Sequence, residues 1–231
     1  MDSMLNFNFS KHFHFEVNAI LAKKSVIPTE LSHVEKINYF HQKNGIRSKE
    51  IGIPFQTHSK NCKIIKDAGY FENTDGLITT NDNLILSLSV ADCCPVYIYD
   101  NKLKIKGLIH SGWKGTVNEI SIVALQKLKE LGSDFSNLKI FLGPSIGSCC
   151  YEVQNDVAEL FNNNCKVNIN GNKFKINLKK QIQQDLIRVG ITKKQILLSE
   201  ICTFENDYCE SYRRDKESSG RMIALFGDLK I

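Results

Sequence analysis

The sequence has no apolar run approaching the roughly 18 residues that a membrane-spanning helix requires. Its first residues, MDSMLNFNFSKHFHFEV, also lack the charged segment followed by an apolar segment that marks a secretory signal. We therefore expect a cytoplasmic protein that has no membrane partner.

Proline and linker segments are scarce as well. Only 4 prolines occur in 231 residues, and we find no internal repeat, low-complexity tract or Pro/Gly/Ser-rich linker. Apolar residues make up 42% and charged residues 24% of the chain, which excludes a disordered or collagen-like protein. These features predict one domain over residues 1–231.

Charge of one sign is not in large excess, since the net charge is only +5. The stretch from Asn164 to Lys194 is the exception, with eight basic residues and Asp185 as its one acidic residue. Phe174 alone interleaves them, so the stretch lacks the aromatic platform of a single-strand binder. We interpret it as a solvated strand and helix face and expect no nucleic-acid partner.

The 8 cysteines include the adjacent pairs Cys93-Cys94 and Cys149-Cys150. Neighbouring cysteines bridge each other poorly, and a chain of this length does not need a disulfide framework. We expect reduced thiols.

Hydrophobic patterning predicts strands and helices that are mixed without strict alternation. This favours an α+β, sandwich-like architecture over a doubly wound sheet. Strands are expected at 84–90, 95–99, 104–110 and 138–142, and helices at 32–43, from 117 onward, at 152–163 and at 177–189.

Metal-capable side chains stand in the segments QTHS, ADCCPV and HSGWKG, at strand ends or beside breaks. His58 and His110 offer imidazole nitrogen, and Cys93 or Cys94 offers a thiolate. Two imidazoles and one thiolate leave one position of a tetrahedral zinc open for water or substrate, as in catalytic sites. Buried residues near turns, without a metal, are the alternative interpretation.

The motifs QTHS, ADCCPV, HSGWKGT, GPSIGSCCYEV and SYRRDKESSGRM, in this order, resemble the YfiH-like family, also called the laccase-domain or polyphenol-oxidase-like family. The resemblance covers about residues 56–231. It implies a zinc ion bound by His58, Cys93 and His110, and a mixed β-sandwich core surrounded by helices. It also implies phosphorolysis of adenosine, inosine and methylthioadenosine, with adenosine deaminase activity alongside.

The N-terminal third departs from this family. The usual Thr-Arg-x-Gly-Gly-x-Ser stretch is absent, and Asn38 is followed by Tyr39 where the family commonly has arginine. These departures concern substrate contacts and leave the metal ligands unchanged, so a divergent substrate preference is open.

Further residues have both a functional and a structural interpretation. Backbone N–H groups of the loop from Gly143 to a helix expected at Glu152 could bind phosphate. Trp113 could stack on a purine or anchor the core, and Cys150 could line the pocket or pack. Asp75 or Asp92 could orient a ligand histidine.

Arginines cluster at Arg213, Arg214 and Arg221, and guanidinium groups match phosphate in bidentate geometry. Arg214 and Arg221 are the predicted phosphate ligands, because Arg213 and Arg214 would point to opposite faces of an extended chain. The alternative is pairing with nearby carboxylates.

Four functions remain in view. The first is a zinc-dependent purine nucleoside phosphorylase, a monomer or homodimer acting on a nucleoside and phosphate. The second is a metal-free cysteine hydrolase with Cys93 as nucleophile and His110 as base. A copper oxidase is disfavoured because the chain has 6 histidines and one His-x-His pair, at His12 and His14. A non-catalytic nucleoside-binding protein is the fourth.

Overall fold

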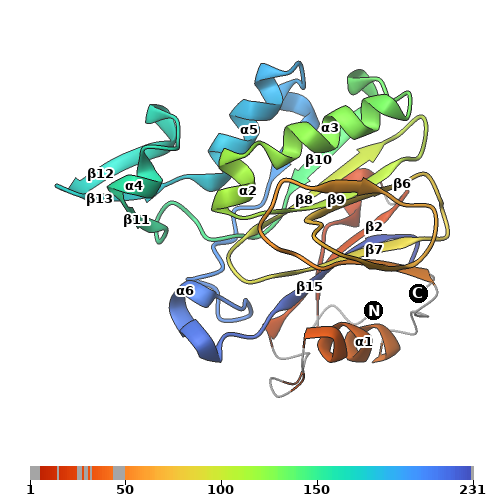
Figure 1. Ribbon diagram of the computed structural model, residues 1–231, viewed down its shortest axis with the longest axis horizontal. Coiled ribbons are helices and arrows are strands. Elements are labelled where there is room, and N and C mark those ends of the chain that lie inside the picture. Colours follow the sequence, from red (N-terminus) through yellow and green to blue (C-terminus); the bar gives the residue numbers. More distant parts are fainter. Residues whose placement is uncertain are drawn as a thin grey trace.

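The computed structural model in Figure 1 describes residues 6–14, 16–24, 28, 31, 33–43 and 50–229. Two six-stranded sheets form its centre. In order across the first sheet are β1 (Asn6–Asn8), β2 (Asn18–Ala22), β15 (Met222–Gly227), β7 (Ile85–Val90), β3 (Ile51–Pro54) and β5 (Gly69–Phe71). Across the second are β14 (Ile196–Leu198), β10 (Leu138–Leu142), β8 (Cys94–Asp100), β9 (Lys106–Ser111), β6 (Gly76–Thr79) and β4 (Cys62–Ile64).

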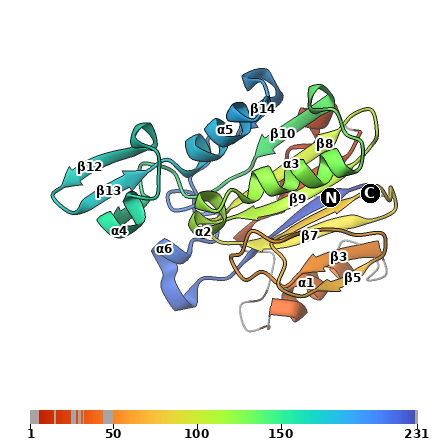
Figure 2. The ribbon, with the colours of Figure 1, turned by 45° about the horizontal axis from the view of Figure 1, so that its top comes forward.

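The sheets stack face to face, and helices cover their outer faces (Figure 2). Helices α3 (Ile120–Glu130) and α5 (Leu178–Arg188) pack on the second sheet, and α1 (His33–Lys43) packs on the first through Phe40. A small sheet of β11 (Glu152–Gln154), β13 (Lys173–Ile176) and β12 (Lys166–Asn170) projects to one side (Figure 1). The short helices are α2 (Trp113–Val117), α4 (Asn155–Ala158) and α6 (Tyr212–Asp215).

Strand β8 shows why the layers form. Successive strand side chains point to opposite faces. Val96 and Ile98 therefore pack against α3 and α5, whereas Tyr97 and Tyr99 pack between the two sheets. All seven residues of β8 are buried, so the strand contributes to both cores.

The predicted sandwich with surrounding helices is confirmed. The helix expected from Glu152 is wrong: residues 152–154 form β11, which pairs with β13, and the following α4 is only four residues long. Within the part of the chain that the structure describes, no helix has the length and apolar content needed to cross a bilayer.

The basic stretch lies on β12, β13, α5 and the chain that follows. Lys173, Arg188, Lys193 and Lys194 are exposed, as a solvated face requires. Lys179 is the exception, because it is buried and its Nζ donates to the carbonyl oxygen of Ser199 at 2.6 Å.

Candidate metal centre

The fold brings His58, Cys93 and His110 together. His58 lies in the loop after β3, Cys93 directly before β8, and His110 near the end of β9. Strands β8 and β9 pair with Pro95 opposite His110, which sets Cys93 beside the end of β9. The potential ligand atoms of the three residues all lie within 4.8 Å of one another.

Close approach at this point depends on backbone features. A Cβ added to Gly112 would lie 2.7 Å from Cys93 Sγ and 3.3 Å from the His58 ring, so a side chain there would displace the cluster. His58 has a φ of 58°, which is unusual for a residue other than glycine. Such conformations persist where surrounding contacts enforce them, often at functional sites.

The Asp75 carboxylate provides those contacts. It is fully buried, and it accepts hydrogen bonds from the backbone N–H groups of Thr57 (3.1 Å), His58 (3.1 Å) and Ser59 (2.8 Å). Its Oδ1 also lies 2.8 Å from His110 Nδ1. A proton on Nδ1 leaves Nε2 of His110 with a free lone pair for a metal, the arrangement that fixes a ligand histidine.

Charge coupling in the cluster is strong. Burial by itself would raise the pKa of the Cys93 thiol, but His110 and His58 lower it to about 6. Burial would lower the pKa of His110, but Cys93 and Asp75 raise it to about 9. Without a metal, the cluster thus favours a Cys93 thiolate beside a protonated His110, and a metal that binds must displace the proton from His110 Nε2.

Cys94 is set apart from this cluster although it is adjacent in sequence. Its side chain packs in the core with Val96 and Ile98, on the helix-covered face of β8. Burial raises its pKa to about 12. The geometry therefore distinguishes Cys93 from Cys94 as a candidate ligand, which the pattern of residues alone did not.

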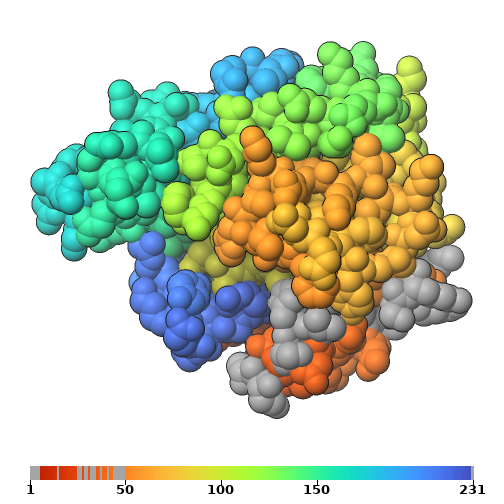
Figure 3. All heavy atoms as spheres, in the orientation of Figure 1, coloured from red at the N-terminus to blue at the C-terminus, as the bar shows by residue number. Residues whose placement is uncertain are grey.

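A pocket of about 1000 Å³ opens above the cluster. Figure 3 shows the surface recessed beside the blue segment that contains α6 and the light-green segment that contains α2. Aromatic side chains, charged side chains and the three potential metal ligands line the pocket. They include Phe55, His58, Cys93, His110, Trp113, Tyr151, Tyr212, Arg213, Lys216, Glu217 and Arg221.

The three arginines have different positions. Arg221 and Arg213 both line the pocket. Arg214 is directed elsewhere: its guanidinium donates to the carbonyl oxygens of Phe204 (2.9 Å) and Cys209 (2.7 Å) and pairs with Asp215. The structure thus places Arg213 and not Arg214 at the pocket, because this segment is the helix α6 and not the extended chain that was expected.

Asp92 orients Arg213 and no histidine. One of its carboxylate oxygens accepts from the Arg213 backbone N–H at 2.6 Å, and the other accepts from Thr203 Oγ1 at 2.6 Å. The guanidinium of Arg213 then lies over the ring of Tyr151, 5.2 Å from its centre. Of the two candidate orienting carboxylates, Asp75 is the one that contacts a ligand histidine.

The loop from Gly143 to Glu152 was expected to bind phosphate through its backbone N–H groups. Several of these N–H groups are already paired: Gly143 donates to Pro95, Ile146 to Asp92, and Tyr151 to Gly147. No long helix begins at Glu152. Neither Gly143 nor Cys150 lines the pocket, whereas Ile146 and Tyr151 of the same loop do.

Several pocket residues were not identified from the sequence. Tyr151 and Tyr212 lie inside matched motifs and carry an aromatic ring and a hydroxyl, which was the available signal. Ser89 lies on β7, and its backbone exchanges two 2.8 Å hydrogen bonds with the Gln56 amide. No local pattern indicates that pairing, because it joins segments 33 residues apart.

The chain is similar to known proteins over most of its length. Residues 30–227 match the family described as multi-copper polyphenol oxidoreductase laccase. A purine nucleoside phosphorylase of Staphylococcus epidermidis is 33% identical over 192 residues, covering 76% of this chain and 72% of that protein. One from Borreliella burgdorferi is 33% identical over 187 residues, covering 74% and 77%. The crystal structure of the Bacillus licheniformis hypothetical protein YfiH superposes with a TM-score of 0.89 at 27% identity, covering 98% of this chain and 97% of that one.

Proposed function

This chain belongs to the multi-copper polyphenol oxidoreductase laccase family, and from that premise we propose that it is a zinc-dependent purine nucleoside phosphorylase. The two relatives cited above are named purine nucleoside phosphorylase. The main support for this proposal is that His58, Cys93 and His110 come together in one pocket. Arg213 and Arg221 line the same pocket.

The ligand set fits zinc. Two imidazoles and one thiolate are three ligands of the kinds that zinc accepts, and catalytic zinc sites commonly keep a fourth position open. The Asp75–His110 contact supplies the outer hydrogen bond such a ligand needs. Bound there, zinc would act as a Lewis acid toward a substrate atom. Two imidazoles and one thiolate also occur in blue-copper centres, but the further copper ions of a multi-copper oxidase need many more imidazoles, and the chain has 6 histidines.

The rest of the pocket suits a nucleoside and a phosphate. A volume of about 1000 Å³ is large enough for both. Trp113 and Tyr151 offer aromatic faces to a purine. Arg213 and Arg221 offer cationic donors to phosphate oxygens.

In the proposed reaction, a phosphate oxygen attacks C1′ of adenosine and the bond from C1′ to purine N9 breaks. The bonding pair leaves with the base, which takes up a proton and departs as adenine, and ribose 1-phosphate remains. Inosine and methylthioadenosine follow the same course. Deamination of adenosine at C6, with water as nucleophile and ammonia as product, is the accompanying activity that we propose.

Chromatography of adenosine incubated with purified protein tests the proposal. Adenine and ribose 1-phosphate should form only when phosphate is present, with slower formation of inosine. Activity should disappear after chelation and return with zinc but not with copper. Base release that ignores phosphate would contradict phosphorolysis, and the absence of any product would favour a nucleoside-binding protein.

A cysteine hydrolase is the second candidate, favoured by the Cys93, His110 and Asp75 arrangement. A thiolate paired with a histidine that a carboxylate orients is the usual activated nucleophile. A thiolate bound to zinc is no longer a free nucleophile. Release of ammonia from a simple amide by chelator-treated protein, but not by zinc-loaded protein, would support this candidate and contradict the first.

A further inference from the structure

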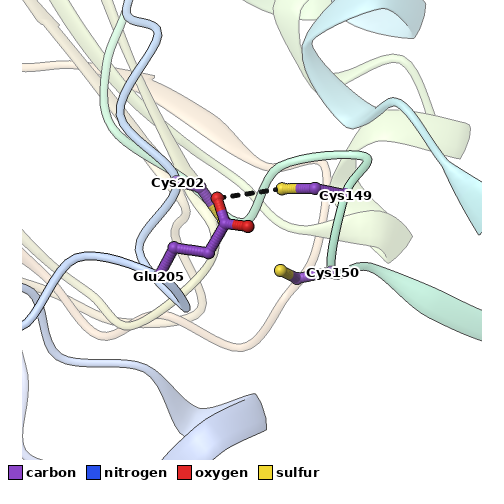
Figure 4. A group of neighbouring side chains, drawn as sticks. All are labelled: Cys149, Cys150, Cys202 and Glu205. Carbon is purple, nitrogen blue, oxygen red and sulfur yellow. Dashed lines mark hydrogen bonds between the residues drawn. The ribbon is translucent and has the colours of Figure 1, made fainter.

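Three thiols and a carboxylate lie close together on two neighbouring segments of the chain, as Figure 4 shows. Cys149 and Cys150 come from the loop after β10, and Cys202 and Glu205 come from the chain between β14 and α6. Their potential ligand atoms, one from each residue, all lie within 4.8 Å of one another. We call this group the tricysteine cluster. It shares no residue with the His58 centre.

The two segments are joined by backbone contacts. Ser145 and Cys202 form a parallel β-bridge, and the Thr203 N–H donates to the Ser145 carbonyl at 3.1 Å. The Gly147 N–H points at Cys202 Sγ, 3.2 Å away. A Cβ on Gly147 would lie 3.2 Å from Cys202 Cβ and 3.3 Å from Cys202 Sγ, so a side chain there would crowd the second loop. The thiols are therefore brought together by the backbone and not by chance rotamers.

Arg214 secures the second loop. Its Nη1 donates to the carbonyl oxygens of Thr203 (3.1 Å) and Phe204 (2.9 Å), within the turn that carries Cys202 and Glu205. Five fixed N–H donors on a planar group suit such a clamp. These contacts give Arg214 a structural role, although its side chain does not line the pocket.

Apolar packing accounts for only part of the cluster, since Cys150 packs against the helix-covered core. The Cys149 side chain is exposed, and its thiol donates to Glu205 at 3.3 Å. Only Cys202 is buried. Desolvation and the neighbouring thiols Cys149 and Cys202 raise the pKa of Cys150. The buried ammonium of Lys179 interacts electrostatically with Cys202 and Cys149 and partly offsets their charge once they ionise.

We propose that Cys149, Cys150, Cys202 and Glu205 form a second metal site, which takes zinc or a similar thiophilic divalent cation. Three thiolates and one carboxylate would fill all four positions of a tetrahedral zinc. A shell that the protein fills completely is typical of a structural site. Binding releases three thiol protons to solvent and changes no oxidation state. The proposal does not depend on the function proposed above.

The site would stabilise one wall of the pocket. Ile146 lies three residues before Cys149, Tyr151 directly follows Cys150, and both line the pocket. An ion that links this loop to the chain at Cys202 would therefore restrain the side chains that face the substrate.

Metal stoichiometry tests the proposal. Reduced, metal-stripped protein is titrated with Zn²⁺ and, separately, with Cd²⁺, whose thiolate charge-transfer absorption reports sulfur ligands. We expect about two ions per chain in the wild type and about one in Cys202→Ser. The remaining ion in Cys202→Ser should depend on Cys93, and the remaining ion in Cys93→Ser should depend on Cys202.

Cys165→Ser is the matched control. Cys165 is buried, donates to Asn164 and Gln184 through its thiol, and lies outside both clusters. This variant should still bind both ions. In the Cys93→Ser background, Zn²⁺ should raise Tm, and the additional Cys202→Ser change should abolish that rise, because only an ion bound to the folded state stabilises it.

The outcomes separate cleanly. A single ion in reduced wild type that Cys202→Ser still binds, or two ions in Cys202→Ser, overturns the proposal. So does a cluster that binds no ion when reduced and simply links Cys202 to Cys149 or Cys150 when oxidised. If the wild type binds an ion at the tricysteine cluster but none at the His58 centre, the proposed function is contradicted and the second metal site is supported.

Discussion

The two thiol-containing clusters of this molecule differ in what surrounds each sulfur. Cys93 lies between two imidazoles, one of which Asp75 orients, and it faces a large pocket. Cys202 lies among other thiols and a carboxylate, outside that pocket. Histidines beside a thiol promote the thiolate and leave a ligand position for substrate, whereas further thiols fill every position. The first environment suits chemistry and the second suits structure.

Serine substitutions should separate the two clusters most strongly. Cys93→Ser removes a ligand of the proposed catalytic ion. Because such an ion supplies several kcal/mol and each ~1.4 kcal/mol is tenfold in rate, we expect kcat/KM for adenosine to fall roughly 10³-fold. Cys202→Ser should retain most activity. Phosphate-dependent adenine release measures both.

Cys94→Ser is the control for Cys93→Ser, since the neighbouring thiol packs on the opposite side of β8. It should keep its metal and most of its activity. Equal metal loss from the two variants, or none from either, would contradict the assignment of Cys93.

The pH dependence of thiol alkylation should also differ between the clusters. In metal-free protein the pKa of Cys93 is lowered to about 6, so its thiolate is present above that pH and is lost below it. The pKa of Cys149 is raised above the usual 9.0, so its thiolate forms only in alkaline solution. Iodoacetamide labelling, followed by peptide mass spectrometry from pH 5 to 10, should show Cys93 reacting first.

Loss of the low-pH reaction in His110→Ala would tie the shift to that imidazole. Labelling of Cys93 with an ordinary thiol profile in wild type would show that the imidazoles do not promote its thiolate.

Much of the fold follows from the sequence because alternation and helical spacing are local. Val96 and Ile98 against Tyr97 show period two directly, and α5 closely matches its expected range. Glu152 illustrates the limit: residues 152–154 become a strand only because β13, about 20 residues later, pairs with them. Pairing of distant segments overrides local propensity.

The candidate site divides in the same way. His58, Cys93 and His110 could be selected because their motifs resemble a family, and the structure brings them together. Arg213 and not Arg214 lines the pocket, contrary to expectation, because the expected backbone was extended and the observed one is helical. The tricysteine cluster joins residues more than 50 positions apart, so nothing in the spacing of its cysteines indicated it.

Replacing the orienting carboxylate should weaken only the His58 centre. Asp75→Asn keeps the size of the side chain but removes the charge that fixes His110 and the loop at His58. Loss of such an outer partner typically costs about 10–100-fold in metal affinity. Competition with a chromophoric zinc chelator should show this loss for one ion and an unchanged affinity for the other. Equal weakening of both ions would indicate general unfolding instead.

The adjacent residues Arg213 and Arg214 extend the comparison, because Arg213 faces the pocket and Arg214 contacts the loop of the tricysteine cluster. Arg213 and Arg221 line the pocket, whereas Arg214 clamps the turn that carries Cys202. A hydrogen bond to a charged group contributes about 1.5–3 kcal/mol, so Arg213→Ala or Arg221→Ala should raise the phosphate KM roughly 10–100-fold with metal content unchanged. Arg214→Ala should leave the phosphate KM nearly constant but lower Tm and the affinity of the tricysteine cluster. Phosphate saturation curves, zinc content and thermal melts on the three variants give all the readouts. A raised phosphate KM in Arg214→Ala alone would reverse the assignment, since a clamp that only holds a turn has no reason to act selectively on phosphate.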